Sequence, residues 1–155
     1  MKELFDSLKH VISGENFVFL DTCFLFDLFD RGKSLTPGYN YAVSSFNVEE
    51  LLAVSHRLHK DKVQLRKLVK EHSFLVYDID VHIGDFESEK EYVKGVDKEL
   101  LKLIPDASDA VLLALAVKTK SIVLTKDKHH LFTVELKNFV EKSGIKVFKE
   151  IKDLG

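Results

Sequence analysis

Short, wholly apolar segments that alternate with longer amphipathic ones constrain the fold of this chain more than any other feature. The clearest are FVFL (17–20) and SIVLT (121–125), which carry almost no polar side chain. A strand without a polar face has to be covered on both sides, as in the parallel sheets of α/β proteins. Helices between such strands supply the covering layers. We therefore expect an α/β fold, a three-layer α/β/α sandwich around a mostly parallel sheet.

The same periodicities divide the rest of the chain into elements. Expected strands are residues 17–20, 41–45, 73–79, 121–125 and 145–151. Expected helices are residues 2–12, 22–31, 47–59, 62–71, 85–104 with a break near Gly95, 106–120 and 131–144. No repeat or linker interrupts them, so we expect one domain over residues 1–155, with residues 1–14 as an extra N-terminal helix.

The composition of the chain limits the classes of function that it can have. The net charge of the 155 residues is −2, which gives no general attraction to nucleic acid, so a nucleic-acid contact would need a local basic patch. Cys23 is the only cysteine, which excludes an intramolecular disulfide and a cysteine-based zinc site. We expect no signal peptide and no membrane span, and hence a cytoplasmic location.

Four carboxylates follow strands or begin helices in a way that predicts one site. Asp21 comes directly after FVFL and Asp127 two residues after SIVLT, while Glu50 and Asp109 lie in the first turns of expected helices. In α/β sheets the carboxyl ends of the strands form the ligand-binding edge, so these four side chains are expected to converge there. Crowded carboxylates repel one another unless a cation joins them, and hard ions such as Mg²⁺ or Mn²⁺ prefer oxygen ligands.

Each of these acids also has a plainer interpretation. Asn47-x-x-Glu50 and Asp106-x-x-Asp109 both match capping boxes, in which the later acid bonds free backbone N–H groups at a helix start. Asp127 fits a solvated turn residue equally well.

Basic residues on the expected helical hairpin and beside Asp127 are candidate RNA contacts, although a solvated face is the ordinary interpretation. They are Arg57, Lys60, Lys62, Arg66, Lys67, Lys126 and Lys128.

Three segments, taken in order, resemble the PIN domain family. FVFLDTCFLFDLF resembles the family's opening strand, which ends in Asp-Thr before a short helix. SSFNVEELLAV resembles its second motif, with Glu50 before Leu51 as the acid. SDAVLLALAVKTKSIVLTKDKHHLF resembles its Asp-Ala helix, the strand that follows and a final Thr-x-Asp. The similarity covers about residues 15–150, in the order of the family's motifs.

The resemblance implies a metal-dependent nuclease that hydrolyses RNA phosphodiester bonds, with a Rossmann-like five-stranded parallel sheet. It also implies Mg²⁺ or Mn²⁺ as cofactor. The implied ligands are Asp21, Glu50, Asp109 and Asp127, with Thr22 and Ser45 in support and Asp106 as an assistant to, or replacement for, Asp109.

One departure from the family pattern concerns the residue after Asp21-Thr22. Many members have Asn there and this chain has Cys23, so a polar support for the first acid is expected to be missing. That departure leaves open a catalytically inactive PIN-like scaffold that binds RNA or protein. A toxin nuclease held by an antitoxin protein is a further alternative, and many family members are homodimers.

Overall fold

A parallel six-stranded sheet forms the centre of the protein in the computed structural model, which describes residues 2–54, 62–126 and 133–155. Its strands lie in the order β1-β4-β3-β2-β5-β6, and every neighbouring pair is parallel. The strands are β1 (Lys9–Val11), β2 (Val18–Leu20), β3 (Tyr41–Ser44), β4 (Leu75–Tyr77), β5 (Ile122–Leu124) and β6 (Lys146–Phe148).

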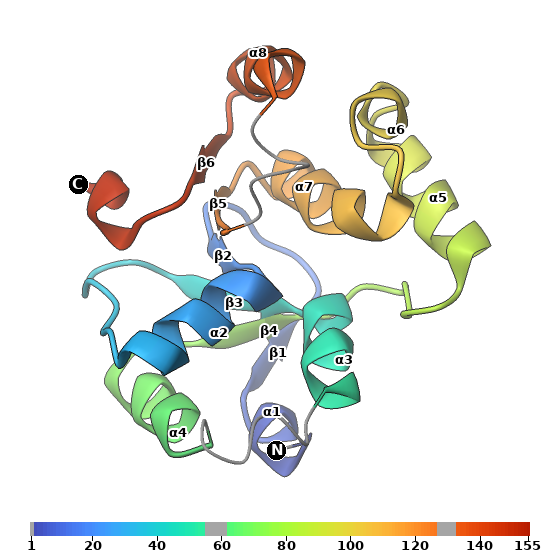
Figure 1. The fold of residues 1–155 in the computed structure, drawn as a ribbon. Coiled ribbons are helices and arrows are strands. Elements are labelled where there is room, and N and C mark those ends of the chain that lie inside the picture. Colours follow the sequence, from blue (N-terminus) through green and yellow to red (C-terminus); the bar gives the residue numbers. More distant parts are fainter. Residues whose placement is uncertain (1, 55–61, 127–132) are drawn as a thin grey trace.

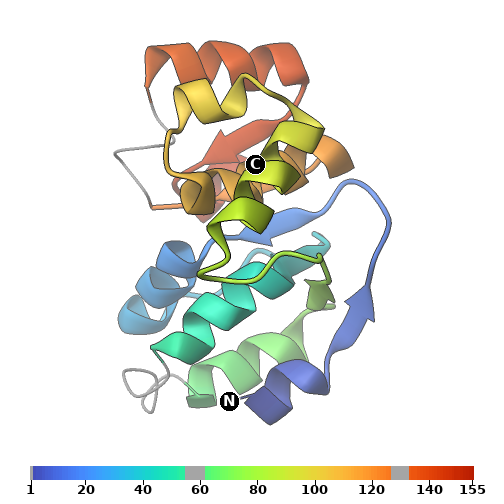
Figure 2. The same ribbon diagram turned by 90° about the vertical axis from the view of Figure 1, so that its right-hand side faces the viewer.

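Helices cover both faces of this sheet, and the fold is therefore a Rossmann-like α/β sandwich (Figure 1). Figure 2 shows α1–α4 in the lower half of the view and α5–α8 in the upper half. The helices are α1 (Lys2–Asp6), α2 (Thr22–Arg31), α3 (Ser45–Ala53), α4 (Lys62–Glu71), α5 (Phe86–Val96), α6 (Leu100–Leu103), α7 (Ala107–Thr119), α8 (Val134–Ser143) and the 3₁₀ helix η2 (Ile151–Leu154).

Side chains of the central strand β2 belong to two separate hydrophobic cores. Phe19 packs into the core under α5–α8, while Val18 and Leu20 pack into the core under α1–α4. All three side chains are at most 2% exposed. Burial on both faces is the reason that the strand is continuously apolar, as the sequence predicted.

The N-terminal segment is the main correction to the expected fold. Residues 2–12 do not form one helix: α1 ends at Asp6, and β1 then adds a sixth strand beside β4. The apolar residues of this segment do have helical spacing. That spacing contains no information about the unpaired backbone N–H and C=O groups at the edge of β4, with which a strand can pair. His10 fixes the bend between the two pieces, because its Nε2 bonds the Phe5 carbonyl at 3.0 Å and its Nδ1 bonds Asp78 at 2.9 Å.

Smaller differences concern element ends. The break expected near Gly95 comes after Val96, where Asp97 accepts a hydrogen bond from Glu99 N at 2.9 Å and so starts a new turn. The final strand is confined to β6, and η2 follows it. The expected continuation of α3 from residue 55 to 59 lies outside the described residues. Among the described helices, none has the length and apolarity needed to cross a membrane.

Candidate metal centre at the carboxyl edge of the sheet

The candidate site lies where β2 and β5 end, at the point where the strand order reverses. From β2 the chain crosses to β3 on one side, whereas β5 lies on the other side of β2. Such a reversal opens a crevice beyond the carboxyl ends of the two strands, which is the usual ligand position in open α/β sheets. The first residue after β2 is Asp21 and the first after β5 is Thr125, and Asp21 N bonds the Leu124 carbonyl at 3.0 Å.

Asp21 is held by donors on both of its carboxylate oxygens. It is the N-cap of α2, and its Oδ1 accepts a hydrogen bond from Thr22 N at 2.7 Å. Its Oδ2 accepts from the Thr125 hydroxyl, also at 2.7 Å. The carboxylate is half-buried, so the apolar run before it ends at the crevice and the acid itself is not in a core.

Asn47 links Asp21 to Glu50. Its Nδ2 lies 3.3 Å from Asp21 Oδ1, 3.1 Å from Thr22 Oγ1 and 2.9 Å from Glu50 Oε1. The Thr22 hydroxyl also donates to Glu50 Oε1, at 3.4 Å. Residues that come from α2 and α3 therefore form one network, although they are 25 to 28 positions apart in the sequence.

The position of Glu50 overturns its capping-box interpretation. The N-cap of α3 is Ser44, whose hydroxyl accepts from Asn47 N at 3.0 Å, so the helix begins three residues earlier than the box requires. Glu50 lies in the second turn and faces Asp21. Burial raises the pKa of Glu50 to about 7, with further contributions from the charges of Asp21 and then Asp109.

Cys23 does not leave Asp21 without polar support, contrary to the expectation from the family pattern. Its thiol lies 3.4 Å from Asp21 Oδ2, and stronger donors come from Thr125 and from Asn47. Burial first, and then the charge of Asp21, raise the pKa of the Cys23 thiol to about 11, so the thiol is protonated at neutral pH and can donate.

Asp109 and Asp106 have different positions at the start of α7. Asp106 is the N-cap: it is exposed, and its Oδ1 accepts from Ser108 N at 3.0 Å. Asp109 is half-buried in the first turn, and its charge is one of the causes of the raised pKa of Glu50, so it lies within electrostatic reach of that side chain. The fourth predicted acid, Asp127, lies outside the described residues.

Ser45, predicted as a supporting residue, is hydrogen-bonded to the segment that follows β4. Its hydroxyl accepts from Ile79 N at 2.9 Å and donates to the Ile79 carbonyl at 3.3 Å. These bonds join the start of α3 to the segment after β4. Thr22, the other predicted support, is part of the acid network itself.

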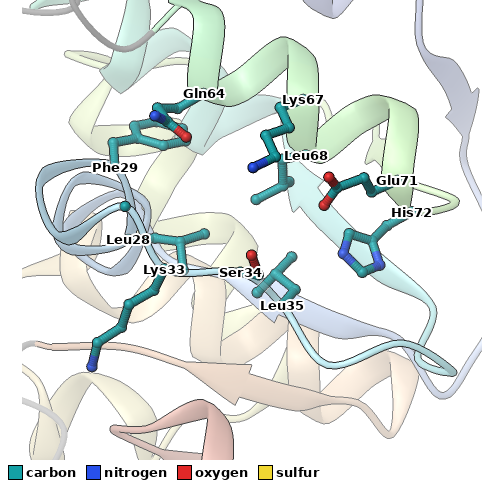
Figure 3. Close-up of a pocket in the computed structure, with 11 residues that line it drawn as sticks. Leu28, Phe29, Lys33, Ser34, Leu35, Gln64, Lys67, Leu68, Glu71 and His72 are labelled. Atoms are coloured by element: carbon teal, nitrogen blue, oxygen red, sulfur yellow. The ribbon is translucent and has the colours of Figure 1, made fainter.

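The predicted basic contacts are dispersed. The ammonium of Lys126 bonds Glu150 at 2.8 Å and lies 3.8 Å from Asp27. Lys67 lines a pocket of about 20 Å³ between α4 and the C-terminal end of α2, where Figure 3 shows it beside Ser34 and Leu68. That volume holds about one water molecule and no phosphate group. The pocket is about 15 Å from Asp21 along α2.

The remaining basic candidates divide between α4 and the undescribed residues. Lys62 is half-buried at the first residue of α4, and Arg66 is exposed one turn further on. Arg57, Lys60 and Lys128 lie outside the described residues.

The donor set of the site fits a hard divalent cation. Its side chains offer carboxylate and hydroxyl oxygens, which are among the ligands that Mg²⁺ and Mn²⁺ prefer. Among the described residues, however, no three His, Cys, Asp or Glu side chains come together closely enough to hold a metal ion by themselves. Asp127, at the fourth predicted position, is not among the described residues.

Comparisons with protein-family models, with curated proteins and with solved structures found no match for this chain. The geometry of the site and the sequence motifs around its acids are therefore the grounds for a functional proposal.

Proposed function

We propose that this chain is a metal-dependent endoribonuclease of the PIN type, which hydrolyses RNA phosphodiester bonds at the carboxyl edge of its sheet. The observation that carries the proposal is the network that joins Asp21 to Glu50 through Thr22 and Asn47, at the reversal of strand order. Two acids from different helices are brought together there by neutral donors, and a third, Asp109, lies within electrostatic reach.

In this proposal the four acids Asp21, Glu50, Asp109 and Asp127 hold Mg²⁺ or Mn²⁺. A bound divalent cation supplies Lewis-acid chemistry: it activates water and neutralises charge that develops on the phosphate oxygens. The chain supplies the positions of the ligands. Thr125 and the backbone of Thr22 hold Asp21, because each donates to one of its oxygens.

The environment of Glu50 supports a cation as the missing partner. Among the described residues no basic side chain pairs with Glu50, and its hydrogen-bond donors are the neutral groups of Thr22 and Asn47. A carboxylate that is half-buried beside other carboxylates has an unfavourable charge at neutral pH unless a cation neutralises it.

RNA phosphates would be held by cations outside the acid network. Within the part of the chain that the structure describes, Lys62 and Arg66 on α4 form no ion pair, whereas Lys126 is bonded to Glu150. Arg57, Lys60 and Lys128 belong to the same proposal. Contacts of this kind orient the strand without reading its sequence.

Cleavage of a fluorescently labelled single-stranded RNA with Mn²⁺ or Mg²⁺ tests the proposal, with D21N and D109N as the variants. Asn is also a good N-cap, so D21N is expected to fold. Loss of a ligand that stabilises the transition state by several kcal/mol lowers the rate by at least about 100-fold.

D106N is the matched control, because it changes an exposed acid three residues from Asp109. It should cut within a few-fold of the wild-type rate. A D21N protein that is folded and cuts as fast as the wild type would refute the nuclease assignment. Metal-independent RNA binding without cleavage in the wild type would instead favour the inactive scaffold.

A further inference from the structure

We propose that Asn47 is the positioning residue that makes Asp21 and Glu50 a single cation site. The inference deepens the proposed function and depends on it, since it concerns the same site. The sequence motif predicted only a helix cap for Asn47, with no role at the acid site.

Asn47 is placed to bridge the acids and is shielded from solvent. Its side chain is 2% exposed, and its Nδ2 lies within 3.3 Å of three oxygens: Asp21 Oδ1, Thr22 Oγ1 and Glu50 Oε1. An amide nitrogen has only two hydrogens, so the three acceptors share them. One neutral group therefore sets the separation of two carboxylates that would otherwise repel each other.

The orientation of the amide follows from its neighbour Ser44. The Ser44 hydroxyl accepts a hydrogen bond from Asn47 N at 3.0 Å, so its own proton is available for Asn47 Oδ1, at 2.6 Å. This bond places Oδ1 toward Ser44 and Nδ2 toward the acids, since the reverse orientation would point the amide oxygen at two carboxylates. Ser44 is the last residue of β3 and fully buried, which ties the amide to the rigid sheet.

A neutral donor at this position has a different effect from a basic one. A lysine or arginine would neutralise the carboxylates and take the place of a cation, whereas the Asn47 amide orders them and leaves their charge. Both hydrogen bonds that Glu50 receives from described residues fall on Oε1, which leaves Oε2 as the oxygen to meet a cation. Outer partners of metal-binding carboxylates typically contribute about 10–100-fold to metal affinity.

The test is calorimetric titration of Mn²⁺ into the protein without RNA, with the wild type beside N47A. We expect N47A to bind Mn²⁺ about 10–100-fold more weakly than the wild type. N47S is the second variant, because its hydroxyl is too short to reach both acids, and the same weakening is expected. S121A is the control for lost stability: it removes a buried hydroxyl at the start of β5, the opposite end of the strand from the site. It should lower the melting temperature and leave the Mn²⁺ affinity unchanged.

A second readout needs no substitution. In the wild type, the side-chain NH₂ resonances of Asn47 should shift on titration with diamagnetic Mg²⁺, because both acids that accept from this group would bind the ion. If the wild type binds Mn²⁺ and N47A or N47S binds it equally well, or if the Asn47 resonances do not move, the inference is wrong while the metal site stands. If the wild type binds neither ion, the metal site of the proposed function and this inference both fail.

Discussion

Replacement of Glu50 by glutamine should stabilise the protein at high pH and not at low pH. Burial and the charges of Asp21 and Asp109 raise the pKa of Glu50 from its ordinary 4.5 to about 7. Between these two values the folded protein holds a proton that the unfolded chain has released. Stability therefore falls as the pH rises through this window, and above about pH 7 the whole penalty of the charged Glu50 is present. E50Q removes that penalty because its side chain is neutral at every pH.

The size of the effect follows from the two pKa values. The interval between 4.5 and about 7 corresponds to on the order of 3 kcal/mol, since one pKa unit is about 1.4 kcal/mol. Glu50 keeps some contact with solvent, so this figure is an upper bound. For a chain of this length, 1 kcal/mol shifts the melting temperature by about 2–4 °C, and E50Q should gain up to about 10 °C.

The assay is thermal unfolding followed by circular dichroism at pH 5 and at pH 8, with a chelator present. E50Q and wild type should melt within about 2 °C of each other at pH 5 and diverge at pH 8. E91Q, which changes an exposed carboxylate on α5, is the control and should alter stability by no more than about 0.5 kcal/mol. An E50Q protein that is less stable than the wild type at pH 8 would refute the reasoning, because Glu50 would then be stabilising in its charged form.

Added Mn²⁺ should remove most of the stability difference between the two proteins at pH 8. A ligand at 100 times its dissociation constant stabilises the folded state by about 2.7 kcal/mol, which is close to the penalty that the Glu50 charge imposes. The wild type should therefore gain several degrees with Mn²⁺, and E50Q, which lacks one ligand, should gain much less. Equal gains in both proteins would place the ion elsewhere.

Three more substitutions distinguish contacts within the acid site from contacts beside it. T125V keeps the shape of a fully buried side chain but removes its 2.7 Å hydrogen bond to Asp21. It should lower the free energy of unfolding, measured with urea, by about 1.5–3 kcal/mol. It should also weaken Mn²⁺ binding in calorimetry. K126M removes the ion pair of Lys126 with Glu150 and its longer one with Asp27, and E150Q removes only the first; because these pairs are partly exposed, both variants should stay close to the wild type in stability and bind Mn²⁺ as the wild type does. A loss of RNA cleavage in K126M that E150Q does not share would instead assign Lys126 to the phosphates.

The parts of the fold that depend on local signals were predictable from the sequence. The prediction of a helix over 22–31 agrees with α2 to the residue, and the helix predicted over 62–71 ends at the same residue as α4, Glu71. Gly32 ends α2 in the left-handed conformation with φ of 60°. The sixth strand was not predictable in the same way. Its pairing with β4 is a contact between segments more than 60 residues apart, and a window of local sequence contains only the helical spacing of its apolar residues.

In the candidate site, too, the residues with a local sequence signal were predictable and those defined by tertiary contacts were not. Asp21 and Glu50 could be proposed because each follows or lies near a recognisable element boundary. The sequence pattern assigned Asn47 to a helix cap, and the cap is in fact Ser44. The contacts of Asn47 with Asp21 and Thr22 depend on how α3 packs against α2, which no local pattern reports. Thr125 was not predicted as a site residue for the same reason: its hydrogen-bond partner Asp21 is 104 residues away in the sequence.

The distribution of charged and neutral groups around the acids is the strongest physical reason to expect a bound cation. Lys126 follows Thr125 directly, and its backbone N–H lies 3.4 Å from the Cys23 sulfur, at the border of the acid network. Its ammonium nevertheless extends away, past the Phe24 ring at 5.5 Å, to Glu150. Among the described residues, the groups that hold Glu50 are neutral, so they order this carboxylate without neutralising it. A fold selected only for stability would gain by replacing Glu50 with a neutral side chain, and retention of the charge is explained if the functional state contains a cation that the charge attracts.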